Sequence, residues 1–512
     1  MNAAGPRRRC EPLRGQRSGG SRKRGGTPMN MRRLLIGLAG FALAGCMVGP
    51  DYERPTVPLP DAFTGADATT VVADSVPPEW WRLFGDPTLD ELVATARANN
   101  TDIRQAVARI EEADANLRAV HAALFPEIDL SGNANRTAFS SKVASPPAAG
   151  TPSVRNDLRL ALTSSFEVDF WGKLRRATEA ARAQDLSTRY AREVVTLSIA
   201  ALTTQTYFSL RSLDAQIAST RATLASRDET LSIVRRRAEG GLASDLDVRQ
   251  AEGARFDAAL QLDEFTRQRE LGEHLLATLT GKLDLTLVPG DITQLPRPAA
   301  PPPGIPSTLL ERRPDIRQAE QDLIAANAQI GVAKAQLFPT ITLTGNFGGE
   351  SAALAGLFTL PGRIWALGAN LSAPIFEGGK LSALVDVQRA RRQQSLANYE
   401  KTIQTSFREV VDALTNVRQY AATERDAQAS VDAAREALRL ATIRYEAGYT
   451  RFLDVLDAQR SLNISELALI RSRQNLLSAN VDLMKALGGG WELGERTARR
   501  QAPGPPGNER PS

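Results

Sequence analysis

The sequence has very few of the residues that build metal centres or disulfide frameworks. It contains two cysteines and two histidines among 512 residues. Two cysteines cannot form a disulfide framework, and two histidines leave little for a metal cluster. Long apolar runs are also scarce: only residues 34–45 are continuously apolar, too few to span a bilayer as a helix. The sequence therefore excludes a multi-helix membrane protein, and we predict no metal site and no cofactor.

Wholesale disorder is excluded as well, because 42% of the residues are hydrophobic and 24% are charged. The net charge of +5 invites a nucleic-acid partner, provided that the charge is spread over the chain. It is not. Residues 1–33 hold ten arginines and lysines against one glutamate, a net charge of +9, so residues 34–512 carry −4. We therefore predict no nucleic-acid partner.

The basic segment has the features of a targeting leader. Arg32 and Arg33 precede the apolar run 34–45, and small residues end that run. A basic region, a short apolar region and small residues before a cut are typical of a secretory signal peptide. The alternative is a short buried helix behind an extended arm. Residues 1–28 precede Met29 and Met31 and resemble no signal, so we expect a start at one of these methionines.

The end of the leader, Leu43 to Cys46, resembles a bacterial lipobox, in which the cysteine is acylated and becomes the first residue. Met47 follows it instead of an aspartate, which for this class implies sorting to the outer membrane. We therefore predict lipidation at Cys46, a covalent lipid that anchors the protein without spanning the bilayer. The mature chain would be residues 46–512, 467 residues with one cysteine.

The chain repeats itself once. Three groups of matching residues occur in the same order: Asp102–Ala106 with Asp315–Ala319, Leu124–Pro126 with Leu337–Pro339, and Leu246–Val248 with Leu453–Val455. This is an internal duplication of about two hundred residues, too long for a solenoid repeat. The predicted domains are a leader and signal peptide (1–45), an extended N-terminal segment (46–85), a first repeat (86–282), a linker (283–306), a second repeat (307–489) and a disordered tail (490–512).

Each copy is predicted to contain a helix, two strands, a long helix and another helix. The first helices are expected over 86–124 and 307–337. The long helices are expected over 173–239 and 380–446, where neither Pro nor Gly occurs. Sixty-seven residues would extend about 100 Å at 1.5 Å per residue. Apolar residues in the second long helix step three and four apart, which is typical of coiled coils.

The strands alternate strictly between apolar and polar residues. The segments 158–170, 340–347 and 365–375 show this pattern. A membrane β-barrel requires it, but a half-buried strand in a soluble sheet shows it too. A bilayer accepts a sheet only if its edges close, and closed membrane barrels need about eight or more strands. Four strands per chain therefore predict an oligomer with cyclic symmetry.

An ordered set of motifs resembles the outer-membrane factors of tripartite efflux systems, the TolC-like channels, and within them the NodT-type or OprM-like lipoprotein branch. The matching residues are Val48–Tyr52, Trp80-Trp81 with Phe84, Asp86-Pro87 and Leu89, Leu309–Ile316, Arg444–Gly448, and Leu453–Gln459. Together they cover residues 43 to about 490.

This resemblance implies a homotrimer of mainly α fold with membrane β structure. Three chains would form a twelve-stranded outer-membrane β-barrel, four strands per chain, that continues into a long periplasmic α-helical barrel. A periplasmic adaptor protein would dock at the helical tips, with an inner-membrane pump of the resistance-nodulation-division type below. Small molecules or drugs would pass outward chemically unchanged. The alternatives are an outer-membrane channel of a protein-secretion system and a lipid-anchored coiled-coil scaffold in the periplasm without a pore.

The same resemblance implies a periplasmic gate at Tyr445, Asp454 and Asp457, with Asp247 as the matching aspartate of the first copy. Rings of carboxylates around a symmetry axis repel anions and admit cations. The alternative is that an aspartate just after a glycine turn caps a helix or favours its first turn. For Asp247 we favour the cap, and for Asp454 and Asp457 the gate. Thr450 and Arg451 depart from the family pattern.

Nothing in the sequence indicates catalysis. His121 and His274 lie in helical stretches far from another ligand. Residues 379–382 resemble part of a phosphate loop, but the spacing of the required glycines fails. The arginines 235–237 are interpreted as a solvated face near a helix C-terminus, with adaptor docking as the alternative. We predict that the protein is not an enzyme.

Overall fold

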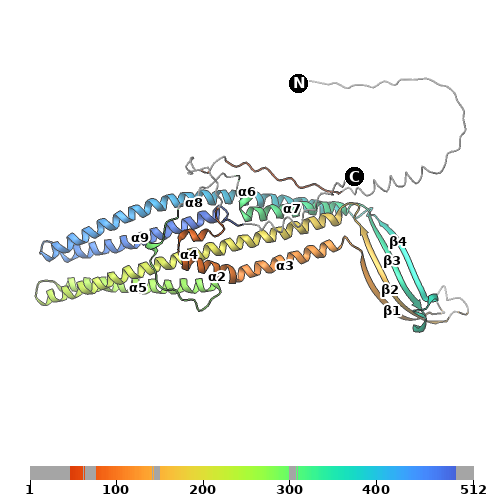
Figure 1. The fold of residues 1–512 in the computed structure, drawn as a ribbon, viewed down its shortest axis with the longest axis horizontal. Helices are drawn as coiled ribbons and strands as arrows, with labels where there is room; N and C mark the ends of the chain where they lie inside the picture. The colour runs from red at the N-terminus through yellow and green to blue at the C-terminus, as the bar shows by residue number, and fades with distance from the viewer. Residues whose placement is uncertain are drawn as a thin grey trace, which may run out of the picture. The chain divides into compact units, whose positions relative to one another are not determined.

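The computed structural model describes residues 47–60, 63, 76–140, 142, 150, 152–298, 307 and 309–491 (Figure 1). The predicted leader, Cys46 and nearly all of the predicted tail therefore lie outside the described residues. Within the described part of the chain, no helix combines the length and the apolarity needed to cross a membrane.

The two copies follow the same order of elements. The first copy comprises α2 (Pro87–Asn99), α3 (Thr101–Ala122), β1 (Glu127–Ala138), β2 (Val154–Val168), α4 (Lys173–Glu239) and α5 (Asp245–Thr280). The second comprises α6 (Leu309–Arg312), α7 (Pro314–Ala335), β3 (Thr340–Ser351), β4 (Arg363–Ser372), α8 (Lys380–Glu446) and α9 (Phe452–Ala486). Short 3₁₀ helices are η1 (Trp80–Phe84), η2 (Ile292–Gln294), η4 (Leu354–Gly356) and η5 (Leu360–Gly362).

The long helices α4 and α8 begin and end at the predicted residues. Each is preceded by a glycine with positive φ, Gly172 and Gly379, and each ends in a turn that contains another, Gly241 and Gly448. Glycine enters this conformation without the steric cost that other residues meet. These glycines therefore fix the ends of helices whose interiors contain no residue that would break them.

The expectation of one helix over 86–124 is wrong, because the chain breaks at Asn100. Its side-chain oxygen accepts hydrogen bonds from the backbone N–H of Asp102 at 2.9 Å and of Ile103 at 3.3 Å. Its amide nitrogen donates to the carbonyl oxygen of Leu279 at 3.1 Å. Asn100 thus starts α3 as an N-cap and ties this break to the end of α5.

The expected helix over 307–337 is also divided. Pro314 lacks a backbone N–H and disfavours the helical conformation of the residue before it, so α7 begins at Pro314 and α6 ends at Arg312. The intervening Arg313 is buried and donates from Nη1 to the carbonyl oxygen of Ala486 at 2.9 Å. This contact holds the division against the end of α9.

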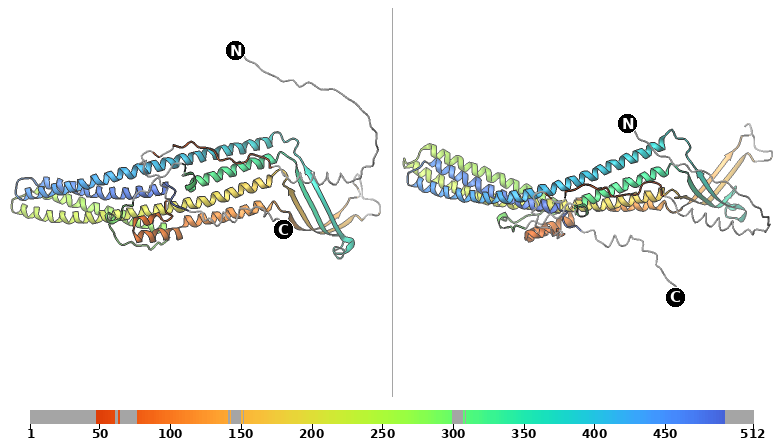
Figure 2. Two further views of the ribbon diagram at one scale, coloured as in Figure 1. Left: turned by 45° about the horizontal axis from the view of Figure 1, so that its top comes forward. Right: turned by 90° about the horizontal axis from the view of Figure 1, so that it is seen from above.

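Helix α4 packs against α3, α5, α7 and α9, and α8 packs against α7 and α9. As Figures 1 and 2 show, α3, α4, α7 and α8 lie in sequence beside one another toward the strands, while α4–α5 and α8–α9 form two antiparallel hairpins at the other end. The main core lies where the hairpins meet η1. Phe84 packs edge-on against Phe208 at 4.9 Å between ring centroids, and Leu477 and Leu483 are fully buried.

The four strands form one antiparallel sheet in the order β1-β2-β3-β4. Its register separates two faces. One row across all four strands reads Leu130, Leu162, Phe347 and Trp365, and all four side chains are exposed. Most of the large apolar residues of the four strands fall on this same face, with Ile364 an exception, because side chains alternate between the two faces with a period of two.

The opposite face of the sheet is polar. One of its rows reads Asp129, Thr163, Asn346 and Ala366. Strands β1 and β4 lie at the two edges and each pairs with one neighbour only within the described residues. A sheet with one apolar face, one polar face and two unpaired edges is suited to a barrel wall completed by other copies.

Residues 47–60, which we call the N-terminal strap, run over the helices without secondary structure of their own. The backbone N–H of Val48 donates to the carbonyl oxygen of Trp171 at 3.0 Å, and Asn327 donates to that of Pro50 at 2.9 Å. Gly49 has φ +118°, and a Cβ there would lie 2.6 Å from the Cα of Gly331. The strap can therefore lie this close to α7 only because glycines face each other.

Midway along the strap, Tyr52 and Arg54 join a network of charges around the buried Glu320. Arg54 donates to the Glu320 carboxylate from Nε at 2.6 Å and from Nη2 at 2.7 Å, and the Tyr52 hydroxyl donates at 3.3 Å. Arg317 donates at 3.3 Å. Burial alone would raise the pKa of Glu320, but the hydrogen bonds and charges of Arg54 and Arg317 hold this pKa below its usual value.

We expect Glu320→Gln to destabilise the protein by about 3 kcal/mol at neutral pH, because it leaves Arg54 without its buried partner. The lowered pKa of Glu320 means that its stabilisation is present above the unfolded value of 4.5 and is lost as the pH falls through the folded value. Thermal melting between pH 3 and 7 should thus show a smaller acid-induced loss in the variant. Glu311→Gln removes another Arg54 partner that is 53% exposed, and should cost less than about 1 kcal/mol. Equal losses in both variants would contradict this assignment.

Candidate functional site

The tip of the α8–α9 hairpin holds three of the four predicted gate residues. Helix α8 ends one residue after Tyr445, and α9 begins at Phe452. The carboxylate of Asp454 accepts a hydrogen bond from the backbone N–H of Arg451 at 3.2 Å, so it stabilises the start of α9. Asp457 is exposed one turn further on, and within the described residues its carboxylate has no hydrogen-bond or ion-pair partner. The two acids share the solvent-facing side of α9.

Tyr445 is held between the two hairpins. Its ring lies 5.6 Å from that of Phe452, and the guanidinium of Arg237 on α4 lies 4.7 Å from the centroid of the Tyr445 ring. Phe452 is buried with Leu231 and Val234 of α4. We call this group, Leu231, Val234, Arg237, Tyr445 and Phe452, the tip cluster. It joins the tip of one copy to the tip of the other.

Asp247 lies in the tip of the α4–α5 hairpin and forms a capping box with Ser244. Its carboxylate accepts from the Ser244 backbone N–H at 3.0 Å and from the Ser244 hydroxyl at 2.9 Å. Its own backbone N–H donates to the Ser244 hydroxyl at 3.2 Å. These contacts are those of the helix cap that the sequence favoured for this residue. Among the described residues, no hydrogen bond joins Asp247 to the other three predicted gate residues.

Sequence reasoning missed Arg237, which was interpreted with Arg235 and Arg236 as a solvated face. Arg235 fits that interpretation, because it is exposed and pairs with Glu252 at 2.7 Å. Arg237 instead covers Tyr445. A signal was available: Val234 lies three residues earlier, so Arg237 lies on the helix face that carries an apolar residue. The partner across the hairpins could not be found from local spacing.

Above the tip cluster, polar contacts join α4 and α9 alongside a small apolar cluster that includes Ile217 and Leu467. Gln459 donates to the Thr230 hydroxyl at 3.3 Å, and the Ser219 hydroxyl donates to Glu466 at 3.2 Å. Asn463 donates to Gln261 of α5 at 3.2 Å. These hydrogen bonds form a seam between the two hairpins, each contributing about 1 kcal/mol or less net. Such a seam separates at lower cost than an apolar interface of the same length.

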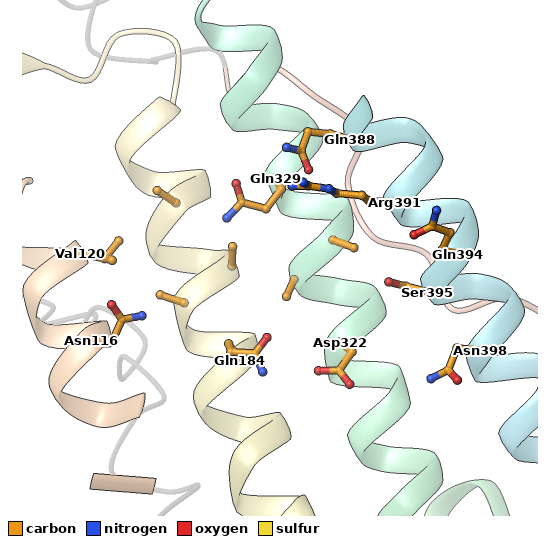
Figure 3. A pocket seen from close by; sticks show the side chains of 15 residues that line it. Asn116, Val120, Gln184, Asp322, Gln329, Gln388, Arg391, Gln394, Ser395 and Asn398 are labelled. Atoms are coloured by element: carbon orange, nitrogen blue, oxygen red, sulfur yellow. The ribbon is translucent and has the colours of Figure 1, made fainter. Parts of the chain in front are cut away.

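Toward the strands, α3, α4, α7 and α8 share a polar surface with a cavity of about 790 Å³ (Figure 3). Its labelled lining side chains are mainly amides, including Asn116, Gln184, Gln329 and Gln388. Asp322 lies beside them and accepts a hydrogen bond from the Ser187 hydroxyl at 2.7 Å. Burial raises the pKa of Asp322 above its usual value.

The described residues contain no group of three or more His, Cys, Asp or Glu side chains able to hold a metal ion. The cavity lining and the exposed carboxylates at the tips are polar or charged, whereas the tip cluster is a buried apolar contact between the two hairpins. The polar and charged groups are suited to contact with water and solutes, and no cluster of nucleophile and base has emerged among the predicted site residues.

The family model described as outer membrane efflux protein matches residues 92–282 and 305–489, most of both copies. The chain belongs to the outer membrane efflux protein family. Among its relatives is the outer membrane protein OprJ of Pseudomonas aeruginosa, 36% identical over 473 residues, covering 91% of this chain and 98% of the relative. The toluene efflux pump outer membrane protein TtgF of Pseudomonas putida is 36% identical over 474 residues. This match also covers 91% of this chain and 98% of the relative.

Solved structures of outer membrane channels are similar to this chain as well. The CmeC outer membrane channel of Campylobacter jejuni superposes with a TM-score of 0.81 at 27% identity, covering 89% of this chain and 97% of that one. The open-state MtrE outer membrane channel of Neisseria gonorrhoeae superposes with a TM-score of 0.78 at 30% identity. The match covers 87% of this chain and 98% of that one. These neighbours confirm the predicted fold class of outer-membrane efflux channels.

This member of the efflux family is an outer-membrane channel subunit of a tripartite efflux pump, as predicted. Its relatives are components of transport systems. Their names favour efflux over the protein-secretion channel and over the scaffold without a pore.

The tip cluster generates a testable expectation. Phe452→Ala should destabilise the contact between the two tips by about 3 kcal/mol or more, because it empties a buried site that both copies line. Hydrogen exchange of the backbone in residues 228–240 and 445–458 should then become faster. Tyr449→Ala is the matched control, since this neighbouring ring is exposed. Unchanged exchange in the Phe452 variant would show that the cluster does not hold the tips together.

Proposed function

We propose that three copies close their strands into one twelve-stranded barrel and export small molecules passively through it. The observation that carries this proposal is the sheet, with its mainly apolar face, its polar face and its two unpaired edges. Each backbone N–H or C=O group that lacks a hydrogen bond at an edge facing hydrocarbon costs several kcal/mol of free energy. Pairing β4 of one copy with β1 of the next removes all edges when the ring closes.

The polar surface of α3, α4, α7 and α8 is proposed to line the export path. On α7, Asp322 and Gln329 line the cavity, whereas Asn327 binds the N-terminal strap. The strap therefore covers one side of the helices and leaves the amide-rich side to the conduit. A wall made mainly of amides and alanines, with Asp322 and Arg391 as its charged residues, is not specialised for one class of solute, which suits passive export of chemically varied small molecules. The relative TtgF is named for toluene efflux.

The gate is proposed at the tips, formed by Tyr445, Asp454 and Asp457, with Asp247 of the first copy beside them. Threefold symmetry would repeat each exposed carboxylate around one axis. Such rings favour cations and repel one another when the tips are close together. Contacts that hold the tips, above all the tip cluster, would then oppose this repulsion.

The remaining partners are proposed to be a periplasmic adaptor protein at the tips, an inner-membrane pump of the resistance-nodulation-division type, and the outer membrane through a lipid on Cys46. The beginning of the strap supports the lipid anchor. Val48, two residues after Cys46, is bonded to Trp171, between the end of β2 and the start of α4. An acyl chain attached here would start near the end of the strands that joins the helices, which is the periplasmic side of the proposed barrel.

Recordings in planar bilayers test the gate. Wild-type trimers should conduct weakly with a preference for cations. Asp454→Asn combined with Asp457→Asn should reduce that preference and raise the conductance several-fold, because the repelling ring is removed. Asp432→Asn, an exposed acid higher on α8, is the control and should leave both unchanged. Unchanged currents in the double variant would contradict the gate, and no conductance in any well-folded trimer would leave only the scaffold.

Asp247→Asn separates capping from gating. Loss of the capping box alone should lower the stability of α5 by about 1 kcal/mol without changing ion selectivity. A changed selectivity at unchanged stability would place Asp247 in the ring with the other acids.

Lipidation is tested by metabolic labelling with a fatty acid in a bacterial host. Cys46→Ser should abolish the label, whereas Cys10→Ser should retain it, since residue 10 belongs to the predicted leader. A label that persists in the Cys46 variant would show that the lipid is attached elsewhere.

A further inference from the structure

The apolar face of the sheet carries only two charges, and both are arginines. The positions of this face, read from the register, are the even residues from 128 to 138 in β1, the even residues from 154 to 168 in β2, the odd residues from 341 to 351 in β3 and the odd residues from 363 to 371 in β4. Arg136 and Arg363 are the charged residues among them. The polar face, in contrast, carries charges of both signs, among them Arg159 and Glu350 at 4.0 Å.

Both arginines lie at the same end of the sheet. Arg136 is two residues from the end of β1, and Arg363 is the first residue of β4. The helices join the strands at the opposite end (Figure 1). In this outer-membrane protein, Arg136 and Arg363 therefore lie toward the outer leaflet. They also lie on the two edge strands, one at each edge. The β1–β4 pairing proposed above between copies therefore places an Arg136 and an Arg363 on the two strands of each seam.

The surroundings of Arg363 are apolar and aromatic. Its guanidinium lies 5.9 Å from the centroid of the Phe347 ring, and Trp365 is exposed two residues along the same face. Residues 352–362 connect β3 to β4 next to Arg363. This loop folds back onto the apolar face, where Leu357 is buried and its backbone lies directly against Gly349. This loop leaves Leu354, Phe358 and Leu360 exposed. An aromatic girdle and exposed apolar groups of this kind are typical of the lipid interface of a barrel.

Within the described residues, no acidic side chain pairs with Arg136 or Arg363, whereas about half of the arginines of the helices are paired with carboxylates, for example Arg176 and Arg269. A guanidinium on a lipid-facing surface needs an anion or water at the level of the headgroups. Its planar fork of donors fits phosphate in a bidentate manner. The position of the two arginines, their positive charge and the exposed apolar groups around Arg363 thus all point to a lipid with a phosphate headgroup.

We propose that Arg136 and Arg363 bind the phosphate-bearing headgroup of an outer-leaflet lipid at each seam between copies, with the loop 352–362 lying against its acyl chains. This inference rests on the proposed trimer. It assigns to the outer rim a lipid site that clamps neighbouring copies where their edge strands pair. A lipid bound by both edges would favour the closed ring over separate chains.

Native mass spectrometry of the full chain, released from nanodiscs, tests the site. The nanodiscs contain phosphatidylcholine with either a bisphosphorylated diglucosamine glycolipid (lipid A) or its dephosphorylated form. The wild-type trimer should retain about three phosphorylated molecules, one per seam. Arg136→Gln and Arg363→Gln should each weaken retention about tenfold. Arg155→Gln is the matched control, because Arg155 lies over Phe139 at 5.3 Å at the same end of the sheet but on its polar face.

The outcomes separate the lipid site from the proposed function. Equal retention of the phosphorylated and dephosphorylated glycolipids by a conducting trimer would overturn the lipid site and leave the channel intact. Displacement of the glycolipid by excess inorganic phosphate would also overturn it, by identifying a site for soluble anions. Equal weakening by Arg155→Gln would show a general effect of charge on the barrel. The absence of trimers and of conductance in the wild type would contradict the proposed function itself.

Discussion

The structure depends on the need to satisfy the backbone groups at the two edges of a four-stranded sheet. Strands β1 and β4 leave their outer edges without partners among the described residues, while one face of the sheet is mainly apolar. Water cannot satisfy these groups inside a bilayer, so they require strands of another copy. This requirement determines how the helices are arranged too, because each strand continues into a helix after a short connection. Closing the sheets into a ring closes the helices into a tube.

The duplication gives the tube two hairpins of similar length. The start of the second helix is capped locally in each hairpin: Asp247 accepts from the Ser244 backbone N–H, and Asp454 accepts from that of Arg451. The two tips also depend on each other, because Phe452 is buried against Val234 of α4 and Ala251 of α5. The two copies therefore share one buried contact at their tips. Exposed carboxylates beside this contact add repulsion where cohesion comes from both copies, which is a suitable arrangement for a gate.

Much of this fold could be predicted from the sequence, because its strongest features are periodic. The bounds of α4 and α8 follow from the absence of Pro and Gly and from glycines at both ends, and the two faces of the sheet follow from strict alternation. The break at Asn100 was missed although Asn is a favoured N-cap, while the contact with Leu279 that also holds Asn100 there lies far along the chain. The tip cluster was missed because no local pattern relates Arg237 to Tyr445. The gate residues themselves came from family resemblance and not from the pattern.

Stability is distributed unevenly along the helices, and this bears on how a channel could open. Around Phe84, Phe208 and Leu477 the core is apolar and densely packed, and each such side chain contributes roughly 1.5–3 kcal/mol when buried. On the tip side of this core the apolar clusters are smaller, and between them the α4–α9 interface has hydrogen bonds such as that of Gln459 with Thr230, which contribute about 1 kcal/mol or less each. Local opening takes place where cohesion is lowest. Movement of the hairpins is therefore favoured on the tip side of the core, while the core keeps the strands and the upper helices fixed in the ring.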